Sequence, residues 1–152
     1  MISVMTDIGP PAALRNLASW QASRVATLGA RLTGARMPLE ARSDFAVLAA
    51  LDEYGELSQA DLGRRLGLDR NNVNGIVTRL ERDGRIERGA DPADRRRNIV
   101  AITEAGLTHL GRLQTLATEV QDELLAALGA PDRERLRALL EKVLASHPAQ
   151  PA

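Results

Sequence analysis

The sequence contains no cysteine among its 152 residues, and Trp20, Phe45 and Tyr54 are its only aromatic side chains. The absence of cysteine excludes a disulfide framework, a thiolate metal site and a thiol-based redox switch. Because aromatic residues are so few, the core must be built mainly from leucine, valine and alanine. Apolar residues make up 44% of the chain, which is enough for a real core, and this composition favours helices.

Long apolar runs are absent too. No stretch approaches the roughly 20 residues of a membrane span, and the N-terminus has no basic segment followed by an apolar run, so no signal peptide is predicted. We therefore expect a cytoplasmic protein with one domain, or one domain with an appended helical part.

Groups suited to catalysis are also scarce. The two histidines, His109 and His147, lie 38 positions apart, and no glycine-rich phosphate loop, metal-ligand spacing or nucleophile with a matching base is found. We therefore expect no enzymatic activity, no metal and no cofactor.

Charge is unevenly distributed along the chain, although the net charge is zero. Residues 64–97 contain ten arginines and six acidic residues, a net charge of +4, and the remainder carries −4. A local positive patch can attract DNA to a protein that is neutral overall.

Residues 57–84 have the pattern of two short helices joined by a tight turn. Ser58 is a suitable N-cap for the first helix, which Gly67 ends, and Asp69 is a suitable N-cap for the second, which Gly84 ends. The second helix has an apolar face made of Val73, Ile76, Val77 and Leu80.

The opposite face of the second helix carries amide and guanidinium groups, which suit base edges and phosphates. These residues could instead be merely solvated. Asparagine is a poor helix former, however, and three asparagines within four positions weaken that interpretation. The face consists of Arg70, Asn71, Asn72, Asn74, Thr78 and Arg79.

A two-stranded hairpin with an arginine-rich tip is predicted next. Ile86 opens it, a turn begins at Asp91, and the second strand contains Ile99, Val100 and Ile102. Arginines 95–97 lie at or just after the tip, where they could enter an electronegative minor groove. Asp94 could orient the guanidinium of Arg96. The alternative is a solvated run of charges.

Apolar spacing predicts further helices at 12–32, 39–54 and 104–128, and one that Pro131 opens, with a break at 34–38 and a short third strand at 56–57. The fold class is mostly α with a small β-hairpin wing. We expect it to comprise a winged helix-turn-helix DNA-binding lobe at 39–103, a further helical region at 10–36 and 104–146, a disordered tail at 1–9 and a frayed tail at 147–152.

Three stretches resemble the MarR family of winged helix-turn-helix transcriptional regulators: LSQADLGRRLGLD, the pattern VxxxVxRLExDG at 73–84, and above all DPADRRRNIVAITEAG at 91–106. The resemblance implies a repressor that binds double-stranded DNA as a homodimer. Its operator would be a pseudo-palindrome with half-sites about 10 bp apart, or a small multiple of that. Gly75, Arg70 and Arg85 depart from the usual pattern of the family, which affects the base contacts rather than the fold.

Each part of this surface receives a predicted role. Asparagine suits bidentate pairing with adenine, so Arg70, Asn71, Asn72 and Asn74 are predicted to face bases in the major groove. Arg96 matches the family's minor-groove arginine, with Asp94 as its partner. Phosphate contacts are predicted for Ser58, Gln59, Thr78, Arg79, Arg95 and Arg97.

Terminal helices with apolar stripes cannot all be buried by a domain of this size, which indicates a partner surface unless they fold back on a monomer. The resemblance implies that this partner is a second copy, with 10–36 and 104–146 as the helical dimerisation region. The predicted dimer interface contains Leu14, Leu17, Leu136, Leu140 and Val143. The resemblance also implies release by a small aromatic or phenolic ligand, with Trp20, Phe45 and His109 as candidate contacts unless these residues only pack in the core.

A competing hypothesis is a winged-helix module that docks proteins and does not bind specific DNA. Such a module would have a wing without arginines or an apolar recognition face, and the sequence shows neither.

Overall fold

The computed structural model describes residues 9–147. The chain divides into two compact units, one formed by the residues up to 29 and from 121 onward, the other by residues 30–120. The predicted tails at 1–9 and 147–152 lie outside the described residues, apart from Gly9 and His147.

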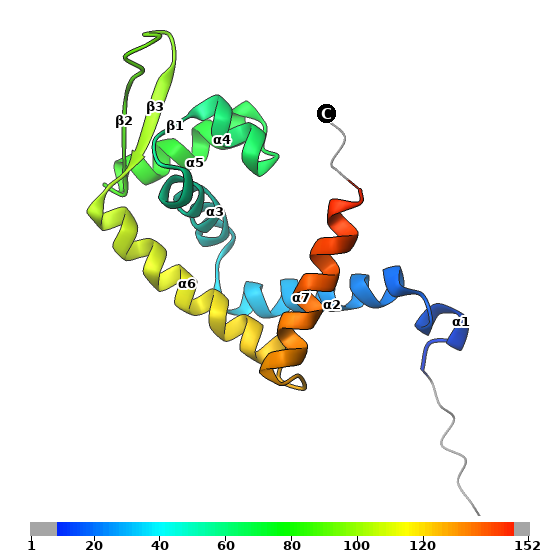
Figure 1. Cartoon of the computed structure of the whole chain (residues 1–152). Coiled ribbons are helices and arrows are strands. Elements are labelled where there is room, and N and C mark those ends of the chain that lie inside the picture. The colour runs from blue at the N-terminus through cyan, green and yellow to red at the C-terminus, as the bar shows by residue number, and fades with distance from the viewer. Residues whose placement is uncertain (1–8, 148–152) are drawn as a thin grey trace, which may run out of the picture. The chain divides into compact units, whose positions relative to one another are not determined.

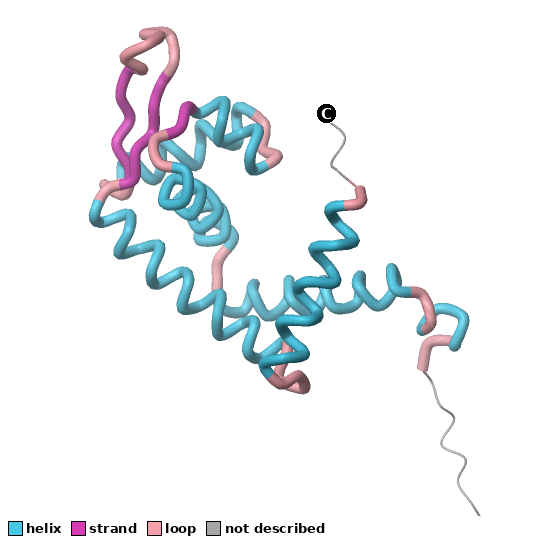
Figure 2. Tube along the Cα trace, viewed as in Figure 1, coloured by secondary structure: helices cyan, strands magenta, loops and turns pink. Residues whose placement is uncertain are grey.

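Three strands, three complete helices and parts of two further helices make up the second unit (Figure 1). The strands form an antiparallel sheet in the order β1-β3-β2, with Ile86 opposite Ile102 and Leu57 opposite Val100. Figure 2 shows the β2–β3 hairpin extending beyond the short helices. The elements are the end of α2 (Ala18–Arg36), α3 (Leu39–Tyr54), β1 (Leu57–Ser58), α4 (Gln59–Leu66), α5 (Arg70–Arg82), β2 (Ile86–Ala90), β3 (Asn98–Ile102) and most of α6 (Glu104–Leu124).

The core of this unit is formed where α3, α4 and α5 meet the sheet. The predicted apolar face of α5 is buried throughout, and the core is completed by Leu48 and Leu51 from α3, Leu62 from α4 and Val100 from β3. Burying all these side chains fixes which face of α5 is left for solvent. The winged helix predicted from the sequence is therefore confirmed.

Local capping sets the boundaries of the short helices. The Ser58 hydroxyl accepts a hydrogen bond from the Asp61 amide (3.1 Å), and the Asp69 carboxylate accepts one from the Asn72 amide (2.9 Å). Gly67 ends α4 with φ +64°, which a residue without a Cβ adopts readily. These predicted caps are confirmed.

The first unit contains α1 (Ala12–Arg15), α7 (Ala130–Ala145), the start of α2 (Ala18–Arg36) and the end of α6. The prediction of one helix over 12–32 was wrong. The chain turns at Asn16, whose amide donates to Ala12 O (3.0 Å), and Gln21 Nε2 donates to Arg15 O (2.7 Å). These bonds supply partners for the backbone where the helix is interrupted.

Two other helix ends differ from the predictions. Helix α2 continues through Gly34 to Arg36, because a single glycine costs only about 1 kcal/mol in a helix; the break comes at Met37 and Pro38. Helix α6 ends at Leu124 rather than at the predicted residue 128. The backbone amides of Leu125 and Leu128 then donate hydrogen bonds to Gln121 O and Leu125 O, which form the turns that lead to α7.

Two features are absent from residues 9–147. No helix there is long and apolar enough to cross a membrane, and no cluster of three or more histidine or acidic side chains could hold a metal ion.

Candidate nucleic-acid interface

Helix α5 presents a continuous polar face to solvent. Arg70, Asn71, Asn74 and Thr78 are exposed along it, and Asn72 is exposed while its Nδ2 donates to the Asp69 carboxylate at the N-cap. Opposite this face, the apolar residues of α5 are held in the core. The helix is therefore fixed by one side and offers amide, hydroxyl and guanidinium groups on the other.

Arg79 is turned away from that face. Its Nη2 donates to Asp44 Oδ1 on α3 at 2.5 Å, and its side chain is only 22% exposed. Arg85 donates to the other oxygen of Asp44 at 3.2 Å. Because Arg79 neutralises a buried carboxylate, we leave it out of the proposed phosphate contacts.

The start of α4 is joined to the wing through Ser58, which is itself buried. The Ser58 hydroxyl donates to the Asp61 carboxylate (2.7 Å) and accepts from Arg97 Nη2 (3.0 Å). The bond from Ser58, followed by the charges of Arg64 and Arg97, lowers the pKa of the Asp61 carboxyl. The first turn of α4 thus has a fixed position relative to the base of the wing.

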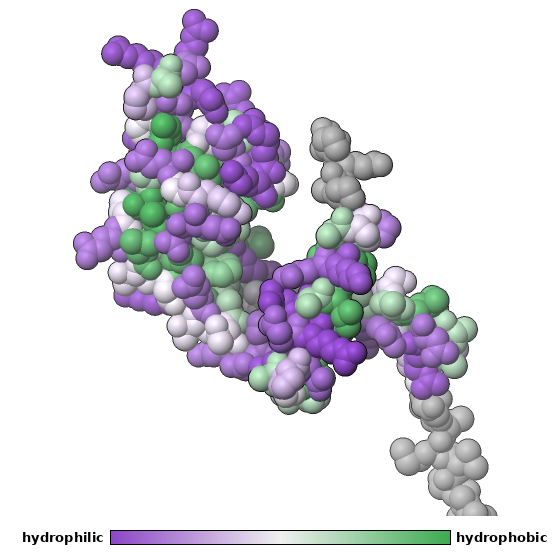
Figure 3. All heavy atoms as spheres, in the orientation of Figure 1, coloured by the Kyte–Doolittle hydropathy of each residue, from purple (hydrophilic) through white to green (hydrophobic). Residues whose placement is uncertain are grey.

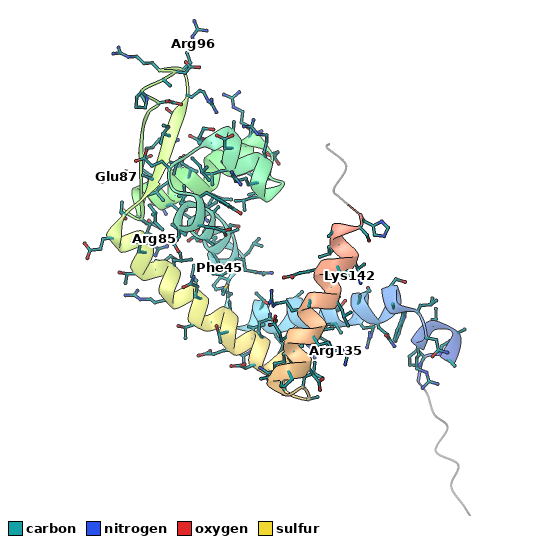
Figure 4. All side chains as sticks on the ribbon, in the orientation of Figure 1. Phe45, Arg85, Glu87, Arg96, Arg135 and Lys142 are labelled. Carbon is teal, nitrogen blue, oxygen red and sulfur yellow. The ribbon has the colours of Figure 1, made fainter. Side chains whose placement is uncertain are left out.

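The wing tip is shaped by aspartate side chains that bond to backbone amides. Asp91 Oδ1 accepts from the Ala93 amide (2.8 Å), and Asp94 Oδ1 accepts from the Arg96 amide (3.0 Å). Asp94 thus bonds to the backbone of Arg96, and no bond to its guanidinium is found among the described residues. Figure 4 shows Arg96 pointing out from the tip, and Figure 3 shows that the tip is hydrophilic. Arg95 is exposed beside it.

A further arginine, Arg88 on β2, was not predicted to belong to the site. Its side chain is only 19% exposed and donates hydrogen bonds to Glu81, Thr78 and Asn74 on α5 and to Gln59 on α4. One feature of the sequence could have indicated that Arg88 faces the helices. Alternate residues of a strand face the same side, so Arg88 shares a face with the buried Ile86.

The three predicted ligand contacts have different surroundings. Trp20, in the first unit, is half-buried with the Arg24 guanidinium 5.8 Å from its ring centroid. Phe45, in the second unit, packs against the core. His109 lines a surface hollow of about 260 Å³. The other residues of its lining are Asp83, Arg85, Ala105, Thr108 and Arg112.

His109 lies at the edge of the Asp44 cluster. Its Nε2 is 3.7 Å from Asp44 Oδ2 and makes no hydrogen bond within the described part of the chain. Burial of the ring, followed by the nearby charge of Arg85, lowers the pKa of His109. The imidazole is therefore held in its neutral form more strongly than an exposed histidine.

Large apolar side chains are exposed in the first unit. Leu14 and Leu17 are 41% and 49% exposed, and on α7 Leu140 and Val143 are 48% and 59% exposed, while Leu136 is half-buried. Four of the five residues predicted for the dimer interface are thus uncovered in the single chain.

Known proteins share both the sequence and the fold. Residues 41–97 match the MarR family. The chain is 33% identical over 102 residues to the HTH-type transcriptional repressor NicR of Pseudomonas putida, covering 67% of this chain and 65% of NicR. It is 30% identical over 99 residues to the homoprotocatechuate degradative operon repressor of Escherichia coli, covering 65% of this chain and 67% of that repressor. The chain therefore spans about two thirds of the length of these curated relatives.

Among solved structures, the PcaV transcriptional regulator of Streptomyces coelicolor, in complex with its natural ligand, superimposes with a TM-score of 0.70 at 29% identity. The match covers 89% of this chain and 96% of PcaV. The matched segment 41–97 includes both short helices and the wing up to Arg97, and these relatives are regulators rather than enzymes. On the combined agreement of sequence and fold, the chain belongs to the MarR family.

Proposed function

We propose that this protein is a sequence-specific transcriptional repressor that binds a pseudo-palindromic operator in double-stranded DNA as a homodimer. The observation that carries the proposal is the pairing, within one compact unit, of the polar face of α5 with an arginine-tipped wing. A helix of this kind fits the major groove, and exposed arginines suit a narrow minor groove.

The side-chain contacts follow from the exposed groups. Arg70, Asn71 and Asn74 would meet base edges, and Arg96 would enter the minor groove. Asn72, which was also predicted to face bases, is left out because its Nδ2 donates to the Asp69 carboxylate at the N-cap. Phosphates would be held by Thr78, by Arg95 and Arg97 of the wing, and by backbone amides at Ser58 and Gln59, where the positive end of the α4 dipole favours an anion.

A second copy of the chain is the proposed partner of the terminal helices. The exposed apolar side chains on α1, α7 and the segment between α1 and α2 belong to the same unit. Solvent-exposed apolar patches of this kind mark interaction surfaces. A two-fold dimer would present two α5 helices to successive turns of the major groove. The proposed dimerisation region is therefore the one predicted from the sequence, residues 10–36 and 104–146.

Release from DNA by a small aromatic ligand completes the proposal. PcaV has been solved with its natural ligand, and the Escherichia coli relative is the homoprotocatechuate degradative operon repressor, which supports a ligand of this class. Phe45 and His109, which belong to the same unit, are the contacts proposed for it. Trp20, the third candidate predicted from the sequence, belongs to the other unit and is not assigned to the same site.

The test is a fluorescence-anisotropy titration against the DNA upstream of the protein's own gene, with a scrambled duplex for comparison. At about 50 and 200 mM salt, we expect the logarithm of the binding constant to fall by about 0.9 per phosphate neutralised for each tenfold rise in salt. Arg96→Ala should weaken binding. Arg135→Ala, which removes an exposed arginine from α7 outside the proposed DNA contacts, should not.

Equal affinity for the upstream and scrambled duplexes would show that the DNA upstream of the gene does not contain the operator. If a selection from random duplexes then yields no preferred site, the DNA-binding proposal fails and a protein-docking role replaces it.

A further inference from the structure

Arg88 joins three elements of the DNA-binding unit through one guanidinium group. Its Nε and Nη2 donate to Glu81 Oε2 at 3.1 and 2.6 Å, and Nη2 also donates to Thr78 Oγ1 at 3.3 Å. Its Nη1 donates to Gln59 Oε1 at 3.3 Å and to Asn74 Oδ1 at 3.4 Å. A single side chain of β2 thus bonds to the first residue of α4 and to three positions along α5.

The surroundings of Arg88 do not suit a phosphate contact. Glu81 balances its charge at hydrogen-bond distance, and only 19% of the side chain is exposed. Each nitrogen of the guanidinium donates to a protein acceptor. Arg88 would have to give up several of these bonds to reach DNA. Any effect of Arg88 on DNA recognition must therefore come through the residues to which it is bonded.

Asn74 is the held residue with the most direct route to a base. Its Oδ1 accepts from Arg88 Nη1 and, at 3.5 Å, from Gln59 Nε2. An amide oxygen has two lone pairs, and these two donors use both. Among the residues that the structure describes, no acceptor is bonded to its Nδ2 group, and Asn74 is exposed. The part of Asn74 left to read a base is therefore its pair of N–H donors.

Adenine recognition by asparagine needs both ends of the amide, because the oxygen accepts from adenine N6 while the nitrogen donates to N7. Guanine presents two acceptors, O6 and N7, in the major groove, and thymine presents O4. Adenine also has the acceptor N7, but its N6 donor lies beside it and would be left without a partner by an amide whose oxygen is already used. We propose that Arg88 sets the specificity of Asn74: by holding Oδ1, it makes Asn74 a donor-only reader that selects guanine or thymine over adenine. This inference rests on the proposed function.

The experiment is a selection of binding sites from random duplexes with four proteins: wild type, Asn74→Ala, Arg88→Lys and Arg82→Lys. Asn74→Ala identifies the base that Asn74 reads, as the position whose preference disappears. Wild type should favour guanine or thymine over adenine there on the order of tenfold, the discrimination expected from one good base contact. Arg82→Lys is the matched control, since it makes the same change at an exposed arginine of α5.

Arg88→Lys keeps a positive charge beside Glu81, but one ammonium group replaces the planar fork that reaches both amides. Once Oδ1 is released, adenine should rise on the order of tenfold relative to guanine or thymine at the Asn74 position, and nowhere else. Arg82→Lys should leave the whole motif unchanged. If Arg88→Lys does not fold by circular dichroism, the paired variant Arg88→Met/Glu81→Gln removes both charges and gives the same test.

The outcomes separate the two proposals. If wild type yields no motif, the proposed function itself is lost. A motif with adenine at the Asn74 position, or one in which Asn74→Ala alters no position, would overturn the role of Arg88 while leaving DNA binding intact. Weaker binding by the Arg88 variant with an unchanged motif would show that Arg88 is only structural, and would also overturn the inference.

Discussion

Asp44 of α3 and Arg79 of α5 form an ion pair with Asp44 Oδ1 2.5 Å from Arg79 Nη2. The Asp44 side chain is only 5% exposed, so its charge is compensated by Arg79 and by Arg85, which bonds to the other oxygen, rather than by water. The pair ties α5 to α3 at the end of α5 away from its N-cap. An arginine that looked suited to phosphate is thereby used to hold the helix in place.

Arg79→Met should destabilise the fold without changing how DNA binding depends on salt. Methionine keeps much of the apolar length but removes the shorter of the two charge-assisted hydrogen bonds of the buried Asp44 carboxylate and leaves only the bond from Arg85. We expect the free energy of unfolding to fall by about 2 kcal/mol. Thermal unfolding of wild type and variant measures this difference in stability. Both proteins are compared at the same concentration, because association of the chain makes the melting temperature depend on concentration.

Arg95→Met is the matched comparison, because Arg95 is exposed near the wing tip. Its stability should stay within about 0.5 kcal/mol of wild type, while the log–log salt slope of DNA binding becomes shallower by about 0.9. The reverse pattern, with an altered slope for Arg79→Met and unchanged stability, would return Arg79 to the phosphate contacts predicted from the sequence.

Gly75 is a position where the chain should gain stability. It lies within α5 on the exposed face, and an added Cβ would meet nothing within 4 Å. Alanine restricts the unfolded chain more than glycine does, so Gly75→Ala should raise the free energy of unfolding by about 0.5–1 kcal/mol. Denaturant titration, with an unchanged slope, is the measurement.

Gly106 provides the opposite case within the same unit. A Cβ there would lie 2.1 Å from the carbonyl oxygen of Arg85 and 2.8 Å from Ile102 Cγ1, because the first turn of α6 packs directly against the backbone. Gly106→Ala should therefore lower the free energy of unfolding by about 2–3 kcal/mol. Similar stability changes for the two alanine variants would contradict this account of α6 packing.

Much of the second unit could be predicted because its determinants are local. Ser58, Asp69 and Gly67 act on backbone groups within a few residues of themselves, and the apolar face of α5 follows from helical periodicity alone. The turn residues of the wing act locally as well. Asp94, however, bonds to the Arg96 backbone, a choice between two nearby groups that spacing does not decide.

The directions of Arg79 and Arg88 could not be predicted, since their partners come from other elements. Arg79 points to Asp44, which is 35 positions away, and Arg88 reaches Gln59, which is 29 positions away. Two weak signals were present. Asp44 falls on the apolar stripe of α3, and a buried carboxylate requires a charged partner. Arg88 is two residues from the buried Ile86 and therefore faces the same side of the strand.

His109 should make the stability of the protein sensitive to mildly acidic pH. Burial and Arg85 lower its pKa below the ordinary value of 6.5 despite the opposing effect of Asp44, and Arg112 also lowers it. As the pH falls below about 6.5, the unfolded chain binds a proton at this histidine more readily than the folded chain. The stability contribution is thus complete above that pH and is lost as the pH falls through the lowered pKa.

The measurement compares the melting temperatures of wild type and His109→Gln at about pH 7.5 and about pH 5.5. Glutamine cannot titrate, so the decrease on acidification should be smaller in the variant. Equal decreases in both proteins would assign the acid sensitivity to other groups.

Leu140 on α7 gives the sharpest test of the proposed homodimer. It is 48% exposed, and Val143, one turn away, is 59% exposed. A carboxylate placed in an apolar interface loses hydration without gaining a partner, which costs several kcal/mol. Leu140→Glu should therefore shift sedimentation equilibrium from dimer to monomer, while Ala138→Glu, which adds the same charge on the opposite face of α7, should leave the dimer intact.

The effect on DNA distinguishes assembly from recognition. The monomer produced by Leu140→Glu keeps the complete polar face of α5 and the wing, because both belong to the other unit. Its affinity for a single half-site should match that of wild type, whereas its affinity for the full pseudo-palindrome should fall, since two half-sites linked through one dimer bind with an effective concentration that two free monomers lack. A variant that stays dimeric would place the interface elsewhere on the chain. A monomer that loses half-site binding as well would show that dimerisation is needed to form the DNA-binding surface made by α5 and the wing.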